Sequence, residues 1–311
     1  ISQNNALNPP TPNGGYVYAM NAPGEDKGDG QVNKGSFSTG KFKKFKHHSF
    51  RGSLADWYTE FNQTIFSSPV VAELIADNPG KEIVIGSGCY FPESSEDKRG
   101  KWVKILSASD GSVLQTLNAS SCSESEPAVG DIDNDGELEI IQAGNGAKAA
   151  GDGNSRIEAW DVTDPEPIWS TELNDAGSTS GYGAHYQSPV IGDINGDGHM
   201  EVIISHSRSV LVFNGNTGEA LTCDSSSCGN KPRLKTGGTL SSTPTLADID
   251  GDGDLEIIQA GSRNGSGVLY VWTNLVDLFP QQETPGAHAA YSTEWSTWRG
   301  NAQRNGVYKS Q

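Results

Sequence analysis

Aspartate or asparagine side chains at alternate positions occur in three short stretches of this 311-residue chain. In the stretch GDIDNDGELEIIQAG, Asp131, Asp133 and Asp135 are followed by a glycine, by Glu139 and by a run of β-forming residues. A hard cation such as Ca²⁺ takes about six to eight oxygen ligands, and residues at positions 1, 3 and 5 of a tight loop can point at one centre. Glycine at position 6 lets the chain turn back, position 7 offers a backbone carbonyl, and position 9 closes the shell. The stretch therefore predicts a calcium loop that leads directly into a strand.

The pattern occurs in two further loops, so we predict three bound Ca²⁺ ions. In each loop the residue at position 7 is expected to contribute only its backbone carbonyl. The predicted ligands are Asp131, Asp133, Asp135, Glu137 and Glu139; Asp193, Asn195, Asp197, His199 and Glu201; and Asp248, Asp250, Asp252, Asp254 and Glu256. A weaker copy follows Pro69, where Ile75 cannot act as a ligand and the interval from Glu73 to Glu82 is one residue too long. We predict that this copy holds no metal.

The loops belong to longer repeats that predict the secondary structure. The copies begin at Pro69, Pro127, Pro189 and Pro244, at intervals of 55 to 62 residues. After each strand that follows a loop come a turn and a strand that contains aromatic residues, such as RIEAWDV, VLVFNGN and VLYVWTN. One unit therefore contains four strands joined by turns, which is the composition of a four-stranded antiparallel blade. The chain is predicted to be all-β.

The three acidic loops, each preceded by Pro-x-x-[GA], resemble those of the FG-GAP/VCBS repeat proteins, which share this loop with the integrin α-subunit propeller. The resemblance covers about residues 67–283. It implies a β-propeller of four-stranded antiparallel blades held by calcium. We expect one propeller domain over residues 1–311, with four full repeats plus a partial blade, and the chain length allows five to seven blades.

The two ends of the chain are expected to complete the partial blade. Residues 14–22 and 56–61 match the third and fourth strands of a blade whose first half is missing. The segment STEWSTWRGNAQRNGVY resembles a signature found at the ends of related secreted propellers. We predict that residues 285–311 form a C-terminal clasp that closes the ring. The alternative is that the chain is cut from a longer propeller.

A basic insertion, residues 23–55, interrupts the N-terminal repeat. Two phenylalanines, Phe42 and Phe45, alternate with its basic residues, which are Lys41, Lys43, Lys44, Lys46, His47 and His48. The insertion could contact an anionic polymer, or it could be a solvated loop whose phenylalanines fold back on the blade. The second interpretation is favoured.

Charge and cysteine content restrict the class of protein. The net charge of −17 argues against nucleic acid as a partner, and no run of 18 apolar residues is present to span a membrane. Cys223 and Cys228 are spaced for a disulfide at a hairpin tip, which leaves Cys89 and Cys122 for each other. Zinc binding is the less favoured alternative. Two disulfides predict a secreted or cell-surface protein.

Three functions fit these features. The first is a secreted, calcium-stabilised binding or adhesion module for a glycan or a protein, with Tyr182, His185 and Tyr186 as candidate ligand-binding residues. The second is a polysaccharide lyase in which a His/Tyr pair supplies the base and the acid. The third is a structural subunit that assembles through the incomplete blade. Neither G-x-S-x-G nor H-E-x-x-H occurs, so an enzyme is less favoured than a binding module.

Overall fold

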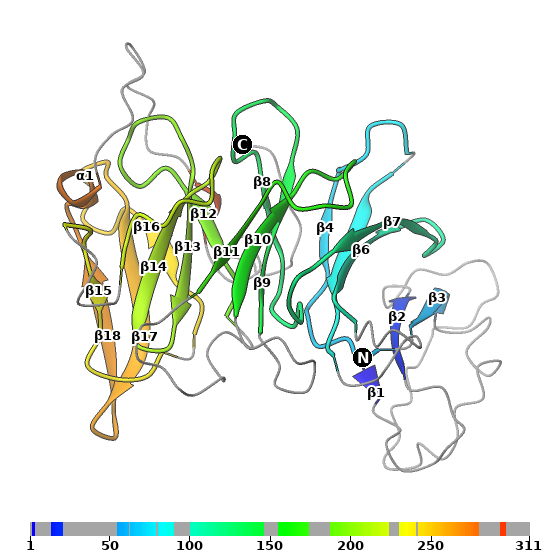
Figure 1. Cartoon of the computed structure of the whole chain (residues 1–311), viewed down its shortest axis with the longest axis horizontal. Helices are drawn as coiled ribbons and strands as arrows, with labels where there is room; N and C mark the ends of the chain where they lie inside the picture. Colours follow the sequence, from blue (N-terminus) through cyan, green and yellow to red (C-terminus); the bar gives the residue numbers. More distant parts are fainter. Residues whose placement is uncertain are drawn as a thin grey trace, which may run out of the picture.

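The chain consists of short antiparallel strands grouped into five sheets (Figure 1). A three-stranded N-terminal sheet is followed by four sheets that we call blades 1 to 4, in sequence order along the molecule. The computed structural model describes residues 2–3, 14–20, 55–61, 63–78, 80–89, 100–145, 155–173, 187–223, 230–240, 242–279 and 293–296.

The strand boundaries agree with the predicted repeats. The N-terminal sheet contains β1 (Ser2–Gln3), β2 (Gly14–Met20) and β3 (Ala55–Phe61); blade 1 contains β4 (Val70–Ala72), β5 (Glu82–Gly86), β6 (Trp102–Ser107) and β7 (Val113–Asn118); blade 2 contains β8 (Ala128–Gly130), β9 (Glu139–Gly144), β10 (Arg156–Trp160) and β11 (Trp169–Glu172); blade 3 contains β12 (Val190–Gly192), β13 (Glu201–His206), β14 (Ser209–Asn214) and β15 (Leu234–Lys235); and blade 4 contains β16 (Thr245–Ala247), β17 (Glu256–Arg263) and β18 (Ser266–Trp272). A short helix, α1 (Leu275–Leu278), and the strand β19 (Thr293–Trp295) follow.

Each blade is an antiparallel meander. Blades 1 and 2 have four strands each, blade 3 has the same four plus β19, and blade 4 has three among the described residues. The predicted all-β propeller architecture of antiparallel blades is confirmed.

The core lies between the blades rather than within one sheet. The first strands of successive blades, β4, β8, β12 and β16, contact one another in turn. We call the side of each blade that faces the next blade in sequence its trailing face. On the trailing face of blade 3, Ile203 and Val212 pack against Leu246 and Ile257 of blade 4. Stacking apolar faces in this way buries both sides of each inner blade, so the order of the repeats sets the order in space.

The N-terminal sheet docks on blade 1. Phe61 packs against Trp102 with ring centroids 5.5 Å apart. Trp57 donates its indole N–H to the carbonyl of Ala108 at 2.9 Å, and Thr59 donates its hydroxyl to the carbonyl of Gly111 at 2.5 Å. Gly111 has φ +74, and a Cβ there would lie within 2.2 Å of the Trp57 ring. The turn that receives this sheet therefore requires a glycine.

The described C-terminal strand, β19, joins blade 3. The rest of residues 285–311, apart from Ser296, lies outside the described residues, so the expectation that the termini together complete the partial blade stays a prediction. In β19, Trp295 pairs with Ile191 and Thr293 pairs with Gly192, on the free edge of β12. The amide of Leu246 in β16 donates to the carbonyl of Ser296 at 2.8 Å, and β19 also contacts β8. The edge of β12 carries unpaired backbone groups that β19 satisfies. The N-terminal sheet takes its strand β1 from the N-terminus itself.

The cysteine predictions are supported in the described residues. Cys89 and Cys122 form a disulfide across a sequence separation of 33 residues. Cys223 is also disulfide-bonded, and its predicted partner, Cys228, lies outside the described residues. Within the described part of the chain, no helix is long and apolar enough to cross a membrane. The basic insertion lies outside the described residues except for Ala55, and the clasp does so except for residues 293–296.

Candidate metal loops

The three acidic loops occupy equivalent places in blades 2, 3 and 4. Each connects the first strand of its blade to the second, so the loops follow β8, β12 and β16. Gly136, Gly198 and Gly253, at position 6, have φ values of +90, +85 and +99, in the left-handed region that favours glycine. The predicted tight turn is therefore formed in all three loops.

The first aspartate of each loop organises the backbone. Gly136 donates its N–H to Asp131 at 3.1 Å, Gly198 to Asp193 at 2.9 Å and Gly253 to Asp248 at 3.1 Å. These bonds draw the chain around the first carboxylate. The side chains at positions 3 and 5 are thereby brought to the same side of the loop.

The closing glutamate of each loop is the first residue of the second strand and is almost fully buried. Glu139, Glu201 and Glu256 have exposed fractions of 3%, 1% and 1%. One carboxylate oxygen of each accepts the N–H of the residue after the first aspartate, at 2.8 Å from Ile132, 2.9 Å from Ile194 and 2.8 Å from Ile249. Burying a carboxylate is costly unless charge or hydrogen bonds compensate it.

Carboxylates at positions 1, 3 and 9 converge in the loops of blades 2 and 4, and the position 5 aspartates are not part of these groups. Asp131, Asp133 and Glu139 place ligand oxygens within 4.8 Å of one another, and so do Asp248, Asp250 and Glu256. The loop of blade 3 carries an amide, Asn195, at position 3 in place of a carboxylate. Oxygen ligands of this kind and spacing suit a hard divalent cation.

The loops differ in solvent access, which the sequence does not indicate. In blade 3, Asp193, Asn195 and Asp197 are buried, with exposed fractions of 0%, 1% and 4%. In blade 4, Asp248 and Asp250 are exposed. The chain enters β19 beside the blade 3 loop, because Thr293 pairs with Gly192, the residue that precedes Asp193.

Burial makes ionisation of these groups unfavourable in the metal-free protein. Desolvation raises the pKa of Glu139 to about 8, with Asp133, Asp135 and Asp131 adding repulsion. Desolvation raises the pKa of Glu201 to about 9, with Asp197 and Asp193 adding to it. A divalent cation in the loop would favour the ionised carboxylates, which is the electrostatic role expected of Ca²⁺ here.

In the weaker copy in blade 1, hydrogen-bond donors of the protein surround the closing glutamate. Glu82, the counterpart of the closing glutamates, accepts the N–H of Leu74 at 2.7 Å and of Ile75 at 3.3 Å. Its other oxygen accepts the side-chain amide of Asn78 at 2.5 Å. Three donors compensate this buried carboxylate without a cation. That this loop holds no metal stays a prediction, now with a physical reason.

Hydrogen bonds fix the backbone N–H groups of the position 7 residues, and the role of their carbonyls as metal ligands stays a prediction. Glu137, His199 and Asp254 donate their backbone N–H groups to the position 5 aspartates of their own loops, at 2.8, 2.9 and 2.9 Å respectively. Their backbone is thus held beside the loop without involving their side chains. The candidate ligand-binding residues Tyr182, His185 and Tyr186 lie outside the described residues, so that prediction and the lyase hypothesis remain untested.

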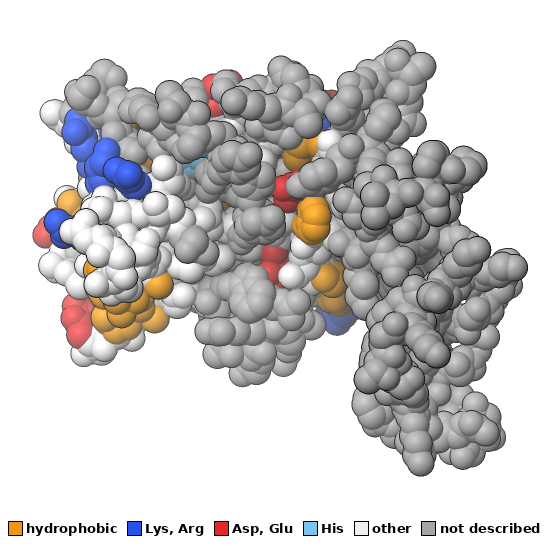
Figure 2. Space-filling model, turned by 90° about the horizontal axis from the view of Figure 1, so that it is seen from below, with side chains coloured by type: hydrophobic (Ala, Val, Ile, Leu, Met, Phe, Trp, Pro, Cys, Tyr) orange, Lys and Arg blue, Asp and Glu red, His pale blue; other side chains and the backbone are white. Residues whose placement is uncertain are grey.

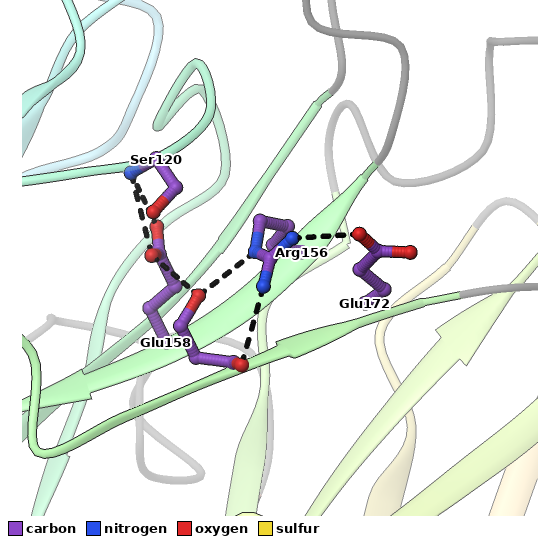
Figure 3. A network of polar contacts seen from close by, with 5 residues as sticks. Ser120, Arg156, Glu158 and Glu172 are labelled. Carbon is purple, nitrogen blue, oxygen red and sulfur yellow. Dashed lines mark hydrogen bonds and ion pairs between the residues drawn. The ribbon is translucent and has the colours of Figure 1, made fainter.

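A polar network around the buried Glu158, which the sequence analysis missed, ties blade 2 to the connection from blade 1 (Figure 3). Glu158, on β10, accepts the N–H of Ser120 at 3.0 Å and the hydroxyl of Ser170 at 2.7 Å. Arg156 donates to Ser170 at 2.8 Å and pairs with Glu172 at 2.9 Å. The sequence signal for this network was Glu158 itself, a glutamate inside the apolar strand segment RIEAWDV. The hydrogen bonds that Glu158 accepts compensate its burial and hold the two segments together. This structural role accounts for the network.

Comparison with known proteins agrees with the loops. Residues 193–259, which include the loops of blades 3 and 4, match the model of the FG-GAP-like repeat. The chain carries an FG-GAP-like repeat. The expected resemblance is thereby confirmed, and the matched FG-GAP-like segment contains the buried and the exposed type of loop. No curated protein matches the chain.

The solved structures that this chain resembles are distant in sequence. BamB from Moraxella catarrhalis is 16% identical, with a TM-score of 0.40, and the match covers 70% of this chain and 52% of that one. The PilY1 C-terminal domain from Pseudomonas aeruginosa is 14% identical, with a TM-score of 0.44 and the same coverage. The rhamnogalacturonan lyase from Bacillus licheniformis is 17% identical, with a TM-score of 0.42, and the match covers 67% and 42%. This chain spans about half the length of the first two. Likeness at this level assigns no function.

The raised pKa values predict how pH acts on the metal-free protein. Glu139 and Glu201 have folded pKa values of about 8 and about 9 against an ordinary value of 4.5, so the folded state binds more protons than the unfolded state between these values. Stability is therefore fully present below about pH 4.5 and is lost as pH rises towards 9. We expect a chelator-treated sample to melt at a lower temperature at pH 8 than at pH 5.5 in differential scanning calorimetry.

Calcium is expected to remove most of this pH dependence, because the ion keeps the carboxylates charged at both pH values. Glu139→Gln is the matched variant, since it deletes one of the two titrating groups and should flatten the slope of the metal-free protein. A metal-free protein that gains stability from pH 5.5 to pH 8 would contradict this prediction.

Proposed function

We propose that the chain is a secreted, calcium-stabilised propeller module that binds a glycan or a protein outside the cell. The observation that carries the proposal is the repeated loop. Three successive blades each bring oxygen ligands around a buried closing glutamate, Glu139, Glu201 or Glu256. The disulfide between Cys89 and Cys122 supports an oxidising compartment.

The residues present fit the proposed ion. Where the loop retains its acids, the closing glutamate has carboxylates as neighbours, whereas in blade 1 the amide of Asn78 takes that role. The neighbours of the closing glutamate thus separate two kinds of loop. In the metal-type loops they are carboxylates that need a cation, whereas Glu82 of blade 1 is compensated by hydrogen-bond donors of the protein. When bound, calcium would supply positive charge that holds three blades in shape, and ligand recognition would be carried out by loops on this rigid frame.

The test of the binding role is a glycan array and a protein array probed with the full chain, first with calcium and then with EDTA. We expect binding that is lost with EDTA and restored by added calcium. Absence of binding in both conditions would contradict the proposed binding role, and calcium would then serve only the stability of the propeller. An assay for β-elimination on uronate polymers, read by absorbance of the unsaturated product, addresses the lyase alternative.

A second candidate function, a subunit of an extracellular assembly, is favoured by the trailing face of blade 4. In blades 1 to 3, which each have a following blade, apolar side chains on this face are fully buried. They are Val70, Ala72, Val84, Val103 and Ile105 in blade 1; Ala128, Ile141, Ala143, Ile157 and Ala159 in blade 2; and Val190, Ile203, Val210 and Val212 in blade 3. In blade 4 the equivalent Leu269 and Val271 have exposed fractions of 65% and 40%. Figure 2 shows hydrophobic side chains gathered at this end of the molecule.

The same apolar pattern therefore lacks a cover in blade 4. The N-terminal sheet covers blade 1 through Phe61 and Val17, in the way that one blade covers the next. The two sheets lie at opposite ends of the row of blades (Figure 1). We therefore propose that the trailing face of blade 4 takes the N-terminal sheet of a second copy, in a head-to-tail contact.

Leu269→Lys tests this contact, because a charge in the centre of an apolar interface is unfavourable. Light scattering over a range of concentrations should show association of the unmodified chain and a monomer for the variant. Ile168→Lys is the matched control, since Ile168 is 47% exposed but lies on blade 2, so this variant should associate like the unmodified chain. A monodisperse monomer at every concentration of the unmodified chain would eliminate the assembly function.

A further inference from the structure

The loops of blades 2 and 3 are joined by a single side chain. Asn134, between Asp133 and Asp135, donates its side-chain amide to the backbone carbonyl of Gly198 at 2.8 Å. Gly198 is the position 6 residue of the next loop. The bond thus connects two candidate calcium loops that are 64 residues apart in sequence.

Asn134 has an unusual backbone for its residue type. It occupies position 4 of its loop with φ +64, whereas the other two loops have Gly196 at φ +73 and Gly251 at φ +82 in this place. Residues other than glycine rarely adopt this region, although asparagine tolerates it best. A glycine would fit the turn without strain, so the asparagine side chain is present at a position where the turn itself does not need it. Its contact with Gly198 is what the side chain contributes.

Both ends of the bond lie between predicted ligands of the two loops. The amide of Asp135 donates to Asp131 at 3.1 Å and to Asp133 at 3.2 Å, so the ligands of the blade 2 loop hold the backbone on either side of Asn134. On the other side, Gly198 donates its own N–H to Asp193 at 2.9 Å. The peptide that accepts the Asn134 amide continues into the N–H of His199, which donates to Asp197 at 2.9 Å.

From this geometry we infer that Asn134 couples calcium binding in the blade 2 loop to calcium binding in the blade 3 loop. The inference rests on the proposed function, since it requires that both loops bind the ion. An ion that orders Asp133 and Asp135 fixes Asn134 in the conformation that holds Gly198, and an ordered Gly198 keeps Asp193 in place. Coupling of this kind is reciprocal, so each ion raises the affinity for the other.

The size of the effect follows from the bond. A neutral hydrogen bond changes an equilibrium constant by about two- to tenfold. The same factor is expected for the calcium concentration at which the blade 3 loop becomes ordered. Because the coupling is reciprocal, losing the blade 2 ion should weaken the blade 3 site, and losing the blade 3 ion should weaken the blade 2 site by the same factor.

The experiment is a double-mutant cycle on the full chain, read by hydrogen–deuterium exchange of the segment 193–201 during a titration with CaCl2. Asn134→Gly removes the contact and suits the left-handed backbone. Asp133→Ala weakens the blade 2 site but retains Asn134. Each single variant is expected to raise the calcium midpoint of segment 193–201 by about two- to tenfold, and the double variant should raise it no further than Asn134→Gly alone.

Gly251→Asn is the matched control. It places asparagine at position 4 of the blade 4 loop, where a Cβ would meet no atom within 4 Å. The midpoint for segment 193–201 should stay unchanged in this variant.

Two results would overturn the coupling while leaving calcium binding in place. The first is a calcium midpoint of segment 193–201 that does not change in Asn134→Gly. The second is a shift of this midpoint by Asp133→Ala that is equally large in the unmodified chain and in the Asn134→Gly variant. Absence of calcium-dependent protection in all three loops would instead remove the proposed function, and the coupling with it.

Discussion

Removal of calcium with excess EDTA is expected to lower the melting temperature of the chain by several degrees or more. Without the cation, two of the loops keep carboxylate oxygens within 4.8 Å of one another beside a buried glutamate. Such like charges repel one another, most strongly where water is excluded. A ligand that binds only the folded state adds about 2.7 kcal/mol at a hundredfold excess over its dissociation constant, and three loops would contribute together.

Two point variants separate the metal effect from general damage to a loop. Asp250→Ala deletes the position 3 ligand of the blade 4 loop and should reproduce part of the loss seen with EDTA. His199→Ala deletes a side chain that our assignment does not use as a ligand, so it should change the melting temperature little. If EDTA leaves the thermal transition unmoved while metal analysis confirms that calcium is gone, the fold is held by blade packing alone.

Loss of the disulfide between Cys89 and Cys122 should cost about 3–4 kcal/mol of unfolding free energy, on the chain-entropy account of a crosslink that closes a loop of this size. The bridge joins the turn after β5 in blade 1 to the connection that leads into blade 2, across 33 residues of sequence. The double variant Cys89→Ser/Cys122→Ser should therefore unfold at lower denaturant concentration. Equilibrium unfolding in urea measures the difference.

Cys223→Ser/Cys228→Ser is the comparison, because the predicted second bridge would close a loop of only a few residues. Its loss should cost about 2 kcal/mol on the same account. Equal losses in the two double variants would show that crosslink length does not govern the contribution of these bridges, and that local strain or packing does.

The local parts of this protein follow from its sequence. The predicted ligand set of each loop lies within nine consecutive residues, and glycine at position 6 allows the left-handed backbone of a tight turn. The loops between β8 and β9, β12 and β13, and β16 and β17 could therefore be placed before the structure was known. Recurrence of the pattern also indicated blades, since a repeated unit with one apolar face must stack on its neighbours. Pairing of Cys89 with Cys122 followed from the remaining cysteines.

Tertiary structure alone decided how these similar units differ. The loop of blade 3 is buried and that of blade 4 is exposed, although their sequences are close to identical in type, and β19 pairs with Gly192 beside the blade 3 loop. The apolar trailing face that is covered in three blades leaves Leu269 exposed in blade 4. Asn134 contacts Gly198 only because blades 2 and 3 stand next to each other. Each of these features depends on which segments meet across long sequence separations, and a pattern that repeats along the chain carries no record of which copy will meet which partner.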